Sequence, residues 1–357
     1  MGNYTLDMLL NQEIYSFEIY SEKLREDWAF IRGNFPMLHV NAYEDNELEA
    51  NKEANLIIYK KQKGSQFKIP IAIFVSNGIL KKYYGILRSL NSAFGGLFIV
   101  DGSLREIEGI RNFFKTEIIE KYFNKRLKVD LISLTNPPLA IIEKPKNLFQ
   151  LNFAYYSYAG NNSILFVDLR EDFFQKLKLT VRNEISSGLD YLNNNLLLDE
   201  TSGQIVNHYV HLEEIKARRL GISPINRSYF EKRVSSSLYK CLVSLDLKTL
   251  NPVCGVIFSL HGNIADFEYN SSGDVGRRTF ANRALLYHSM QISRAMGAKY
   301  FILGTGYIEG GNMTSLTKFK KSMASEEVAC PIFHIPVSLK GRLYIALRIL
   351  ISPVFYN

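Results

Sequence analysis

Two acidic residues spaced as on a strand, Asp266 and Glu268, are the first candidates for chemistry in this sequence. They lie in the stretch 264–270, where alternate side chains of a strand point to opposite faces. Asp266, Glu268 and Asn270 therefore share one predicted face. A carboxylate on a central strand can act as the general base that removes a proton from an amine. Glu268 is preferred because it lies nearer the following loop, and a polar strand face that meets solvent is the alternative.

A loop with glycine and arginine follows this strand and precedes a predicted helix. Free N–H groups and the helix dipole at such a junction attract anions, glycine allows close backbone approach, and arginine can grip phosphate oxygens. We therefore expect the phosphates of a donor molecule here. The residues of this predicted site are Gly273, Gly276, Arg277, Arg278 and, at the start of the helix, Asn282. Asp274 opposes this interpretation, and an ordinary strand-to-helix turn with solvated arginines is the alternative.

Two further candidates lie on either side of this region. The glycine-rich segment 304–312 is expected to form a cleft loop, from which Tyr307 could protonate a leaving thiolate. His211 belongs to a predicted amphipathic helix and could face the same cleft, as could His208 three residues earlier. Side-chain packing for Tyr307 and a partly exposed helix for His211 are the alternatives.

The elements that must position these residues alternate between helix and strand in the second half of the chain. The predicted ranges are strand 164–169, helices 171–190, 204–220 and 223–238, strands 240–245, 253–260 and 264–270, helix 279–296, strand 299–304, helix 315–324 and strand 328–337. This order predicts an α/β (α+β) fold, a mixed sheet with helices on its faces. The sheet is expected to open just before residues 273–278.

The first half repeats this order loosely. Its predicted strands are 14–20, 55–60, 67–75, 96–100 and 127–134, and its predicted helices are 22–32 and 105–123. A proline-containing stretch at about 136–150 separates the halves, because proline disfavours a helix interior or a central strand. A chain of 357 residues is also long for one core. We therefore expect two tandem domains, 1–140 and 150–340, followed by an apolar basic tail, 341–357.

Composition narrows the function class. The chain has 43 Lys and Arg against 35 Asp and Glu, a net charge of +8, which favours an anionic partner such as a cofactor phosphate, a nucleotide sugar, tRNA or an anionic membrane. A hydrophobic content of 46% excludes a mostly disordered chain. Three scattered cysteines argue against a disulfide scaffold and a zinc site, so no metal is expected.

Location follows from the segments at the two ends of the chain. The N-terminus has no secretory-signal pattern and no apolar run is long enough to span a bilayer, which predicts a cytoplasmic protein. The stretch 342–355 combines apolar residues with Arg342 and Arg348, a pattern typical of helices that lie in a membrane interface. Contact with an anionic membrane, at its inner face, is therefore one expectation. Packing on the core and a homodimer face are the alternatives.

The second half resembles the GNAT acyltransferase fold, specifically the branch of Fem-type peptidyltransferases and related cell-envelope acyltransferases. The matching segments are VDLREDFFQKLKLTVRNEIS, HLEEIKARRLGI, IADFEYNSSG, ANRALLYHSMQISRAMGAKYFILGTG and SLTKFKKSMAS. Phe319 and Lys320 fill the Phe-Lys position of this branch, whereas Met323 and Ala324 stand where its members carry an aromatic residue and glycine. The resemblance covers roughly 160–335.

This resemblance implies an N-acyltransferase with two tandem GNAT-like domains. The expected co-substrate is an acyl-CoA, and the expected acceptor is an amine of an amino sugar or cell-envelope glycan precursor, in polysaccharide biosynthesis. Lys320, Phe319 and His211 would contact substrate, while Tyr84 and Arg88 would help to frame the acceptor site. Two alternatives stay open. A Fem-like transferase that uses aminoacyl-tRNA is disfavoured by the lack of long paired helices, and a non-catalytic scaffold is favoured by the missing strict pyrophosphate signature.

Overall fold

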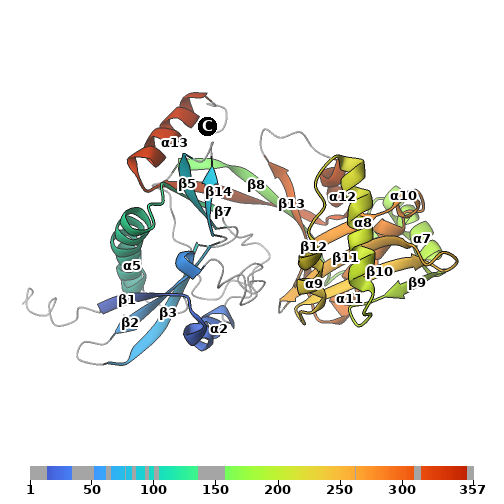
Figure 1. Ribbon diagram of the computed structural model, residues 1–357, viewed down its shortest axis with the longest axis horizontal. Coiled ribbons are helices and arrows are strands. Elements are labelled where there is room, and N and C mark those ends of the chain that lie inside the picture. Colours follow the sequence, from blue (N-terminus) through green and yellow to red (C-terminus); the bar gives the residue numbers. More distant parts are fainter. Residues whose placement is uncertain are drawn as a thin grey trace, which may run out of the picture. The chain divides into compact units, whose positions relative to one another are not determined.

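The chain divides into two compact units (Figure 1). The computed structural model describes residues 14–33, 52–61, 66–76, 78–82, 86–92, 96–99, 104–135, 157–261, 263–308 and 315–351. Unit 1 comprises residues 1–162 and 329–357, and unit 2 comprises residues 163–328. This division differs from the predicted domains 1–140 and 150–340, because the segment after residue 328 returns to unit 1. Ile335 and Val337 are buried in the core of unit 1, and this burial fixes the segment there.

Unit 1 holds two groups of strands. The first is an antiparallel sheet in the order β1 (Ile14–Ile19), β2 (Leu56–Lys61), β3 (Lys68–Val75) and β6 (Gly96–Ile99). The second runs in the order β4 (Gly78–Lys82), β5 (Leu87–Ser92), β7 (Leu131–Thr135) and β14 (Glu326–Pro336). The ladder between β5 and β7 is parallel, and the ladders from β4 to β5 and from β7 to β14 are antiparallel. β4 and β5 were not predicted from the sequence.

The helices of unit 1 cover its apolar core. They are the short 3-10 helices η1 (Glu22–Leu24) and η2 (Lys52–Ala54), α2 (Arg25–Gly33), α5 (Leu104–Phe113), the π-helix η3 (Phe114–Arg126) that continues α5, and α13 (Leu339–Ile351). Phe114, Ile118 and Phe123 of η3 are buried together with Phe74 of β3. The ring centroid of Phe74 lies 5.3 Å from that of Phe114 and 5.3 Å from that of Phe123.

Unit 2 is built on a mixed sheet in the order β8 (Ser157–Asp168), β13 (Tyr300–Ile308), β12 (Ile264–Ser272), β11 (Pro252–His261), β10 (Tyr239–Asp246) and β9 (Asn195–Leu198). Its helices are α6 (Phe173–Lys176), α7 (Leu179–Leu192), α8 (Ile205–Leu220), α9 (Arg227–Val234), α10 (Asp274–Arg278), α11 (Ala281–Ala295) and α12 (Ser315–Met323). Two apolar cores lie on opposite faces of this sheet. One is formed with α7 and α11, and the other with α8 and α9 (Figure 1).

Most predicted elements of the second half are present, because their apolar periodicity is local. α8 spans nearly the predicted helix 204–220, and Gly221 ends it with φ 65° as a left-handed cap, where Ile222 N donates to Ala217 O at 3.1 Å. The predicted helix 171–190 is instead two helices, because Leu177 adopts an extended conformation between them. The mixed α/β architecture in two units agrees with the predicted tandem of GNAT-like domains.

Candidate active site

The sheet of unit 2 opens between β12 and β13, as the sequence predicted. The parallel ladder joins Ile264 to Tyr300, Ala265 to Phe301 and Asp266 to Ile302. The antiparallel ladder of β12 with β11 runs on to Ser272. From Phe267 onward, the described ladders therefore hold β12 on one side alone. The end of a ladder is a place at which strand backbone can meet a bound molecule.

Gly304 marks the point at which β13 leaves β12. Its φ of 86° lies in the left-handed region that only glycine adopts at little cost, and glycine inside a strand is typical of a bend. The amino group of Lys320 lies 3.1 Å from where a Cβ of residue 304 would stand. The bend thus makes room for the lysine side chain at the opening.

A β-bulge redirects the side chains of β12 at the same place. Ile257 of β11 pairs with Tyr269, but Phe258 pairs with Phe267, which leaves Glu268 as the extra residue. Phe267 consequently packs against the core under α7 and α11, whereas Tyr269 is buried in the core under α8 and α9. The prediction that Asp266, Glu268 and Asn270 share one face by simple alternation is therefore wrong. The bulge shifts the alternation by one residue.

Asp266 is buried at the opening, and the half-buried Lys320 lies close enough for the two charges to influence each other. The side chain of Asp266 is 6% exposed, and burial together with the nearby charge of Glu268 raises the pKa of Asp266 well above its usual value. Burial also lowers the pKa of the Lys320 amino group, while the charge of Asp266 raises it. The Lys320 amino group lies 5.4 Å from the centre of the Phe267 ring. Two carboxyl groups and one amine thus lie near the point at which the sheet opens.

Glu268 has an arginine partner on α9. Arg233 Nη2 lies 3.7 Å from Glu268 Oε2, and both side chains are largely buried. The guanidinium stacks over the rings of Tyr229, at 3.6 Å from its centre, and Tyr239, at 5.2 Å. Burial raises the pKa of Tyr229 to about 12, so this phenol stays neutral. The arrangement holds a positive charge beside the candidate base, where it favours the ionised carboxylate.

A second buried carboxylate fixes the strand end of the site to α8. Glu213 is 1% exposed, and its Oε2 accepts a hydrogen bond from the Tyr269 hydroxyl at 2.6 Å. Lys216 Nζ lies 2.6 Å from the same oxygen, and the Ile225 N–H donates to Oε1 at 3.2 Å. Because a buried charge is costly unless it is paired, this complete set of partners indicates a positioning role for Glu213.

Arg283 fixes α12, which carries Phe319 and Lys320. Its Nε lies 3.0 Å from Glu184 Oε2 of α7, and its Nη1 donates to the Ser322 hydroxyl at 2.8 Å. Its guanidinium also stacks over the Phe319 ring at 4.9 Å. One side chain of α11 therefore links α7 to α12 and sets the position from which Lys320 reaches the opening.

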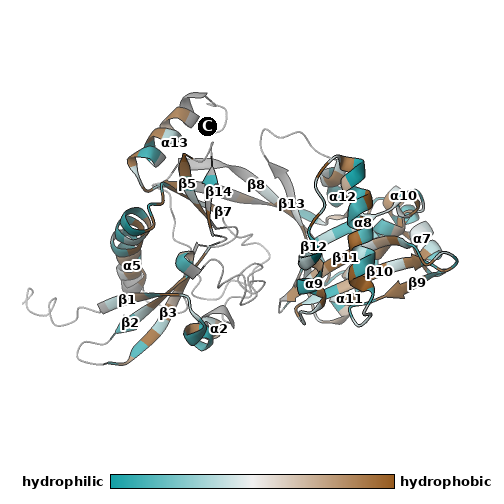
Figure 2. Cartoon of the chain, viewed as in Figure 1, coloured by the Kyte–Doolittle hydropathy of each residue, from teal (hydrophilic) through white to brown (hydrophobic). Residues whose placement is uncertain are grey.

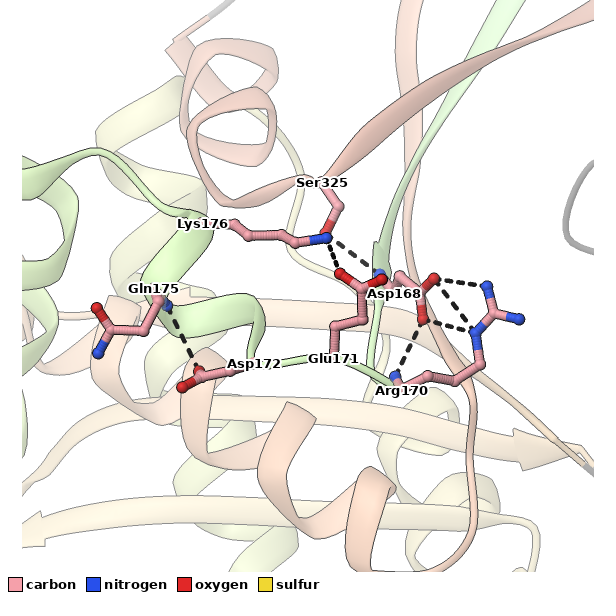
Figure 3. A network of polar contacts seen from close by, with 7 residues as sticks. All are labelled: Asp168, Arg170, Glu171, Asp172, Gln175, Lys176 and Ser325. Atoms are coloured by element: carbon pink, nitrogen blue, oxygen red, sulfur yellow. Dashed lines mark hydrogen bonds and ion pairs between the residues drawn. The ribbon is translucent and has the colours of Figure 1, made fainter.

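A polar network at the end of β8 secures the turn after α12 (Figure 3). The Asp168 carboxylate binds Arg170 through two oxygens, with Nη2 to Oδ2 at 2.6 Å and Nε to Oδ1 at 3.0 Å. The Asp168 N–H donates to the Ser325 hydroxyl at 3.2 Å. Hydrogen bonds from Arg170 lower the pKa of Asp168. In the same network Lys176 pairs with Glu171, and the Asp172 side chain caps α6.

The residues of the predicted phosphate loop form a short helical turn with some hydrogen bonds of its own. Residues 274–278 form the short helix α10, and the Gly273 N–H donates to Val253 O at 3.0 Å. Arg277 pairs with Asp274 and donates from Nη1 to Ser272 O at 3.1 Å. Gly276 is buried, and a Cβ there would stand 2.6 Å from Val253 O. The glycine and arginine of this turn thus have structural partners of their own, which supports the alternative of an ordinary turn.

The structure brings together some of the predicted site residues and separates others. Asp266, Glu268 and Lys320 meet at the opening, with Phe319 packed at the edge of the adjacent core. His211 is exposed on α8 beside His208, Asn282 lies in the first turn of α11, and Arg278 is exposed on α10. Arg88 lies on β5 of unit 1, where its N–H donates to Asp130 Oδ2 at 3.0 Å. Tyr84 and the side chain of Tyr307 lie outside the described residues.

Sequence reasoning missed Arg233, Arg283 and Glu213. Arg233 lies in SYFEKRV and Glu213 in HLEEIKARRL, where a charged residue on a helix is usually taken as solvated. The available signal was the run of aromatic residues beside Arg233, since a guanidinium often stacks on such rings.

Metal clusters and membrane-spanning helices are both absent from the described ranges. No group of three or more His, Cys, Asp or Glu side chains within those ranges is arranged to bind a metal ion. Within them, no helix combines the length and apolar character that a bilayer crossing requires.

Comparisons with known proteins identify the fold. No protein-family model matches the chain, and no curated protein sequence matches it. Among solved structures, FemX aligns with a TM-score of 0.63 at 12% identity, over 93% of this chain and 99% of that one. The C-terminal domain of a putative lysylphosphatidylglycerol synthetase from Agrobacterium fabrum aligns with a TM-score of 0.48 at 12% identity, over 78% and 86% of the two chains. A tandem GNAT protein from the clavulanic acid biosynthesis pathway aligns with a TM-score of 0.48 at 8% identity, over 91% and 99%. By the FemX alignment, the chain has the Fem-type GNAT fold that the sequence resemblance predicted.

Proposed function

We propose that unit 2 is an N-acyltransferase, which moves an acyl or aminoacyl group from an activated donor to an amine. The observation that carries the proposal is the opening of the sheet after Asp266, with Asp266, Glu268 and Lys320 gathered at it. Titratable groups with perturbed pKa values, gathered where two strands separate, are candidates for proton transfer. The fold shared with FemX is consistent with this reaction class.

The proposed step is direct attack of the amine on the donor carbonyl. A C–N bond forms, the C–S bond of a thioester or the C–O bond of an ester breaks, and the amine loses one proton. Glu268 accepts that proton, and Arg233 keeps the carboxylate ionised beforehand. Asp266 supplies the proton that the leaving thiolate or alkoxide takes, since burial and the charge of Glu268 raise its pKa and so favour its protonated form.

Lys320 and the open edge of β12 would stabilise the oxyanion of the tetrahedral intermediate. Backbone N–H groups or a fixed cation aimed at developing negative charge commonly contribute about 2.7–4 kcal/mol per donor. Tyr307 of β13 is retained as a second candidate acid, and Phe319, His211, Tyr84 and Arg88 as candidate substrate contacts. The turn at Gly273, Gly276, Arg277 and Arg278, with Asn282, is retained as a weaker candidate for donor phosphates.

The same proposal extends to the identity of the donor and the acceptor. We favour an acyl-CoA as donor and the amine of an amino sugar or cell-envelope glycan precursor as acceptor, in the cytoplasm. Aminoacyl-tRNA is the second donor, because FemX shares the fold. A homodimer remains a prediction from the sequence.

The test is a transfer assay with the full chain and a panel of donors and acceptors. The donors are acetyl-CoA, longer acyl-CoAs and aminoacyl-tRNA, and the acceptors are amino sugars and nucleotide-linked amino sugars. Thiol release and product mass should report transfer, and Glu268→Gln should lower the rate about 100-fold or more. Glu231→Gln, an exposed glutamate of α9 paired with Arg227, is the matched control and should leave the rate unchanged. If the wild type consumes no donor, the catalytic proposal fails and the scaffold alternative stands.

A further inference from the structure

The inner side of α13 is anchored to unit 1 by a close helix–strand contact. A Cβ on Gly341 would collide with Asp130 O, so only glycine allows the helix to lie this near. The Ser338 hydroxyl donates to Asp130 Oδ1 at 2.6 Å, and the Val337 N–H donates to Asp130 O at 2.9 Å. Further along the helix, Ile345 is buried against Leu87 and Leu131. The helix is therefore fixed in rotation, with one side turned inward.

The opposite side of α13 carries an exposed row of leucines. Leu339, Leu343 and Leu347 are 73%, 56% and 56% exposed. Residues four apart lie on one face of a helix, so the three side chains form a continuous outer stripe. Figure 2 shows strongly hydrophobic positions on this helix beside hydrophilic ones. A surface helix normally carries polar residues on its outer side, and this helix carries leucine there.

Basic residues flank this outer stripe. At about 100° per residue, Lys340 lies beyond one edge of the stripe and Arg342 beyond the other, and both side chains are exposed. Neither Asp nor Glu occurs in the sequence from Val328 to its last residue. An apolar face bordered by cations, with no acid on its own helix, is complementary to a surface that combines acyl chains with negative headgroups.

We propose that the outer face of α13 binds an anionic membrane surface, with the helix lying in the plane of the interface. Leu339, Leu343 and Leu347 enter the boundary between headgroups and acyl chains, and Lys340 and Arg342 contact anionic headgroups. A second copy of the chain fits this face less well. A two-fold contact through the stripe would bring the cations of both copies together, with no acid on α13 to neutralise them.

The inference is tested by flotation of the full chain with phosphatidylcholine vesicles that contain or lack phosphatidylglycerol. Wild type should float with the anionic vesicles alone, and less at high salt because the charges are screened. Leu343→Gln with Leu347→Gln should abolish flotation. Lys340→Gln with Arg342→Gln should weaken the affinity about fivefold per residue.

A matched control separates this face from general surface apolarity. Leu220→Gln changes a leucine of α8 that is 55% exposed, and it should leave flotation unchanged. All variants lie at exposed positions, so their circular dichroism and thermal midpoints should match the wild type.

Two results would overturn the inference. One is a wild type that does not float with anionic vesicles at low salt. The other is flotation that survives Leu343→Gln with Leu347→Gln. A wild-type dimer that the same double variant dissolves, without vesicle binding, would assign the face to a second copy. The inference does not depend on acyl transfer, since no readout here measures activity.

Discussion

Polar groups are arranged differently at Asp266 of β12 and in the turn 273–278 that follows this strand. In the turn 273–278 beyond its end, the Gly273 N–H and the Arg277 side chain, two of the groups that suggested a phosphate site, are bonded within the protein. At Asp266, where the ladder with β13 stops, buried ionisable groups are crowded together, and burial shifts Asp266 and Lys320 toward their neutral forms. Residue type alone therefore indicates a functional site less well than does the energetic cost of the arrangement. Bonded polar groups, as in the turn, stabilise the fold. Crowded, buried ionisable groups, as at Asp266, cost stability but can take part in proton transfer.

The largest expected effect comes from removing the cation at the opening. Lys320→Met should lower the rate of acyl transfer about 100-fold, since loss of one oxyanion contact typically costs 10²–10³-fold. Lys318→Met changes an exposed lysine of the same helix and serves as the control. Steady-state kinetics with both variants measure the difference. Equal rates for the two variants would remove Lys320 from the site.

Substitutions in the turn 273–278 should change the free energy of unfolding rather than the rate of transfer. Gly276→Ala should lower the free energy of unfolding by about 1–3 kcal/mol, because its Cβ would meet Val253 O. Gly273→Ala is the matched control, since a Cβ there would lie 3.7 Å from the same oxygen, and it should cost less than about 1 kcal/mol. Urea denaturation measures both. Similar losses at the two glycines would contradict the packing account of the turn.

Arg233 should act on the rate through Glu268. Arg233→Met should lower kcat/KM about tenfold, equal to about 1.4 kcal/mol, and should move the acidic limb of the pH–rate profile to higher pH, because the guanidinium favours the carboxylate. Arg227→Met on the same helix is the control. A rate loss without a shift of the limb would indicate a purely structural role for Arg233.

The smallest effect is expected in the network at the end of β8. Arg170 lowers the pKa of Asp168 in the folded state, so the ionised carboxylate adds stability above the unfolded pKa of about 3.9, and this is lost as pH falls through the folded value. Asp168→Asn should therefore be less stable than the wild type at neutral pH, and the gap should close in acid. Asp190→Asn, an exposed change on α7, is the control. A gap that persists at low pH would show that the charge is not its cause.

Local patterns in the sequence were sufficient to predict much of unit 2. The strand containing Asp266 and the helix ending at Gly221 follow from periodicity and a glycine cap, both of which act within a few residues. The bulge at Glu268 depends on the register against β11, which no local pattern encodes. The return of Ile335 to unit 1 depends on partners such as β7, about two hundred residues away in sequence.

The candidate site was predicted in part for the same reason. Asp266 and Glu268 were found because both lie on one strand, and Lys320 because of the family resemblance. Arg233 was missed because its relation to Glu268 exists only after α9 docks on the sheet. A phosphate site at the turn 273–278 stays a prediction, and its sequence does not reveal that the Gly273 N–H donates to Val253 O.

Hydrogen exchange of the full chain with and without acetyl-CoA tests the central claim most directly. If the donor enters the opening of the sheet, the amides of Phe267, Glu268, Leu303 and Gly304 should become protected, while those of the turn 273–278 should change little. Acyl transfer accompanied by protection of the turn alone, with no change at the opening, would contradict the account.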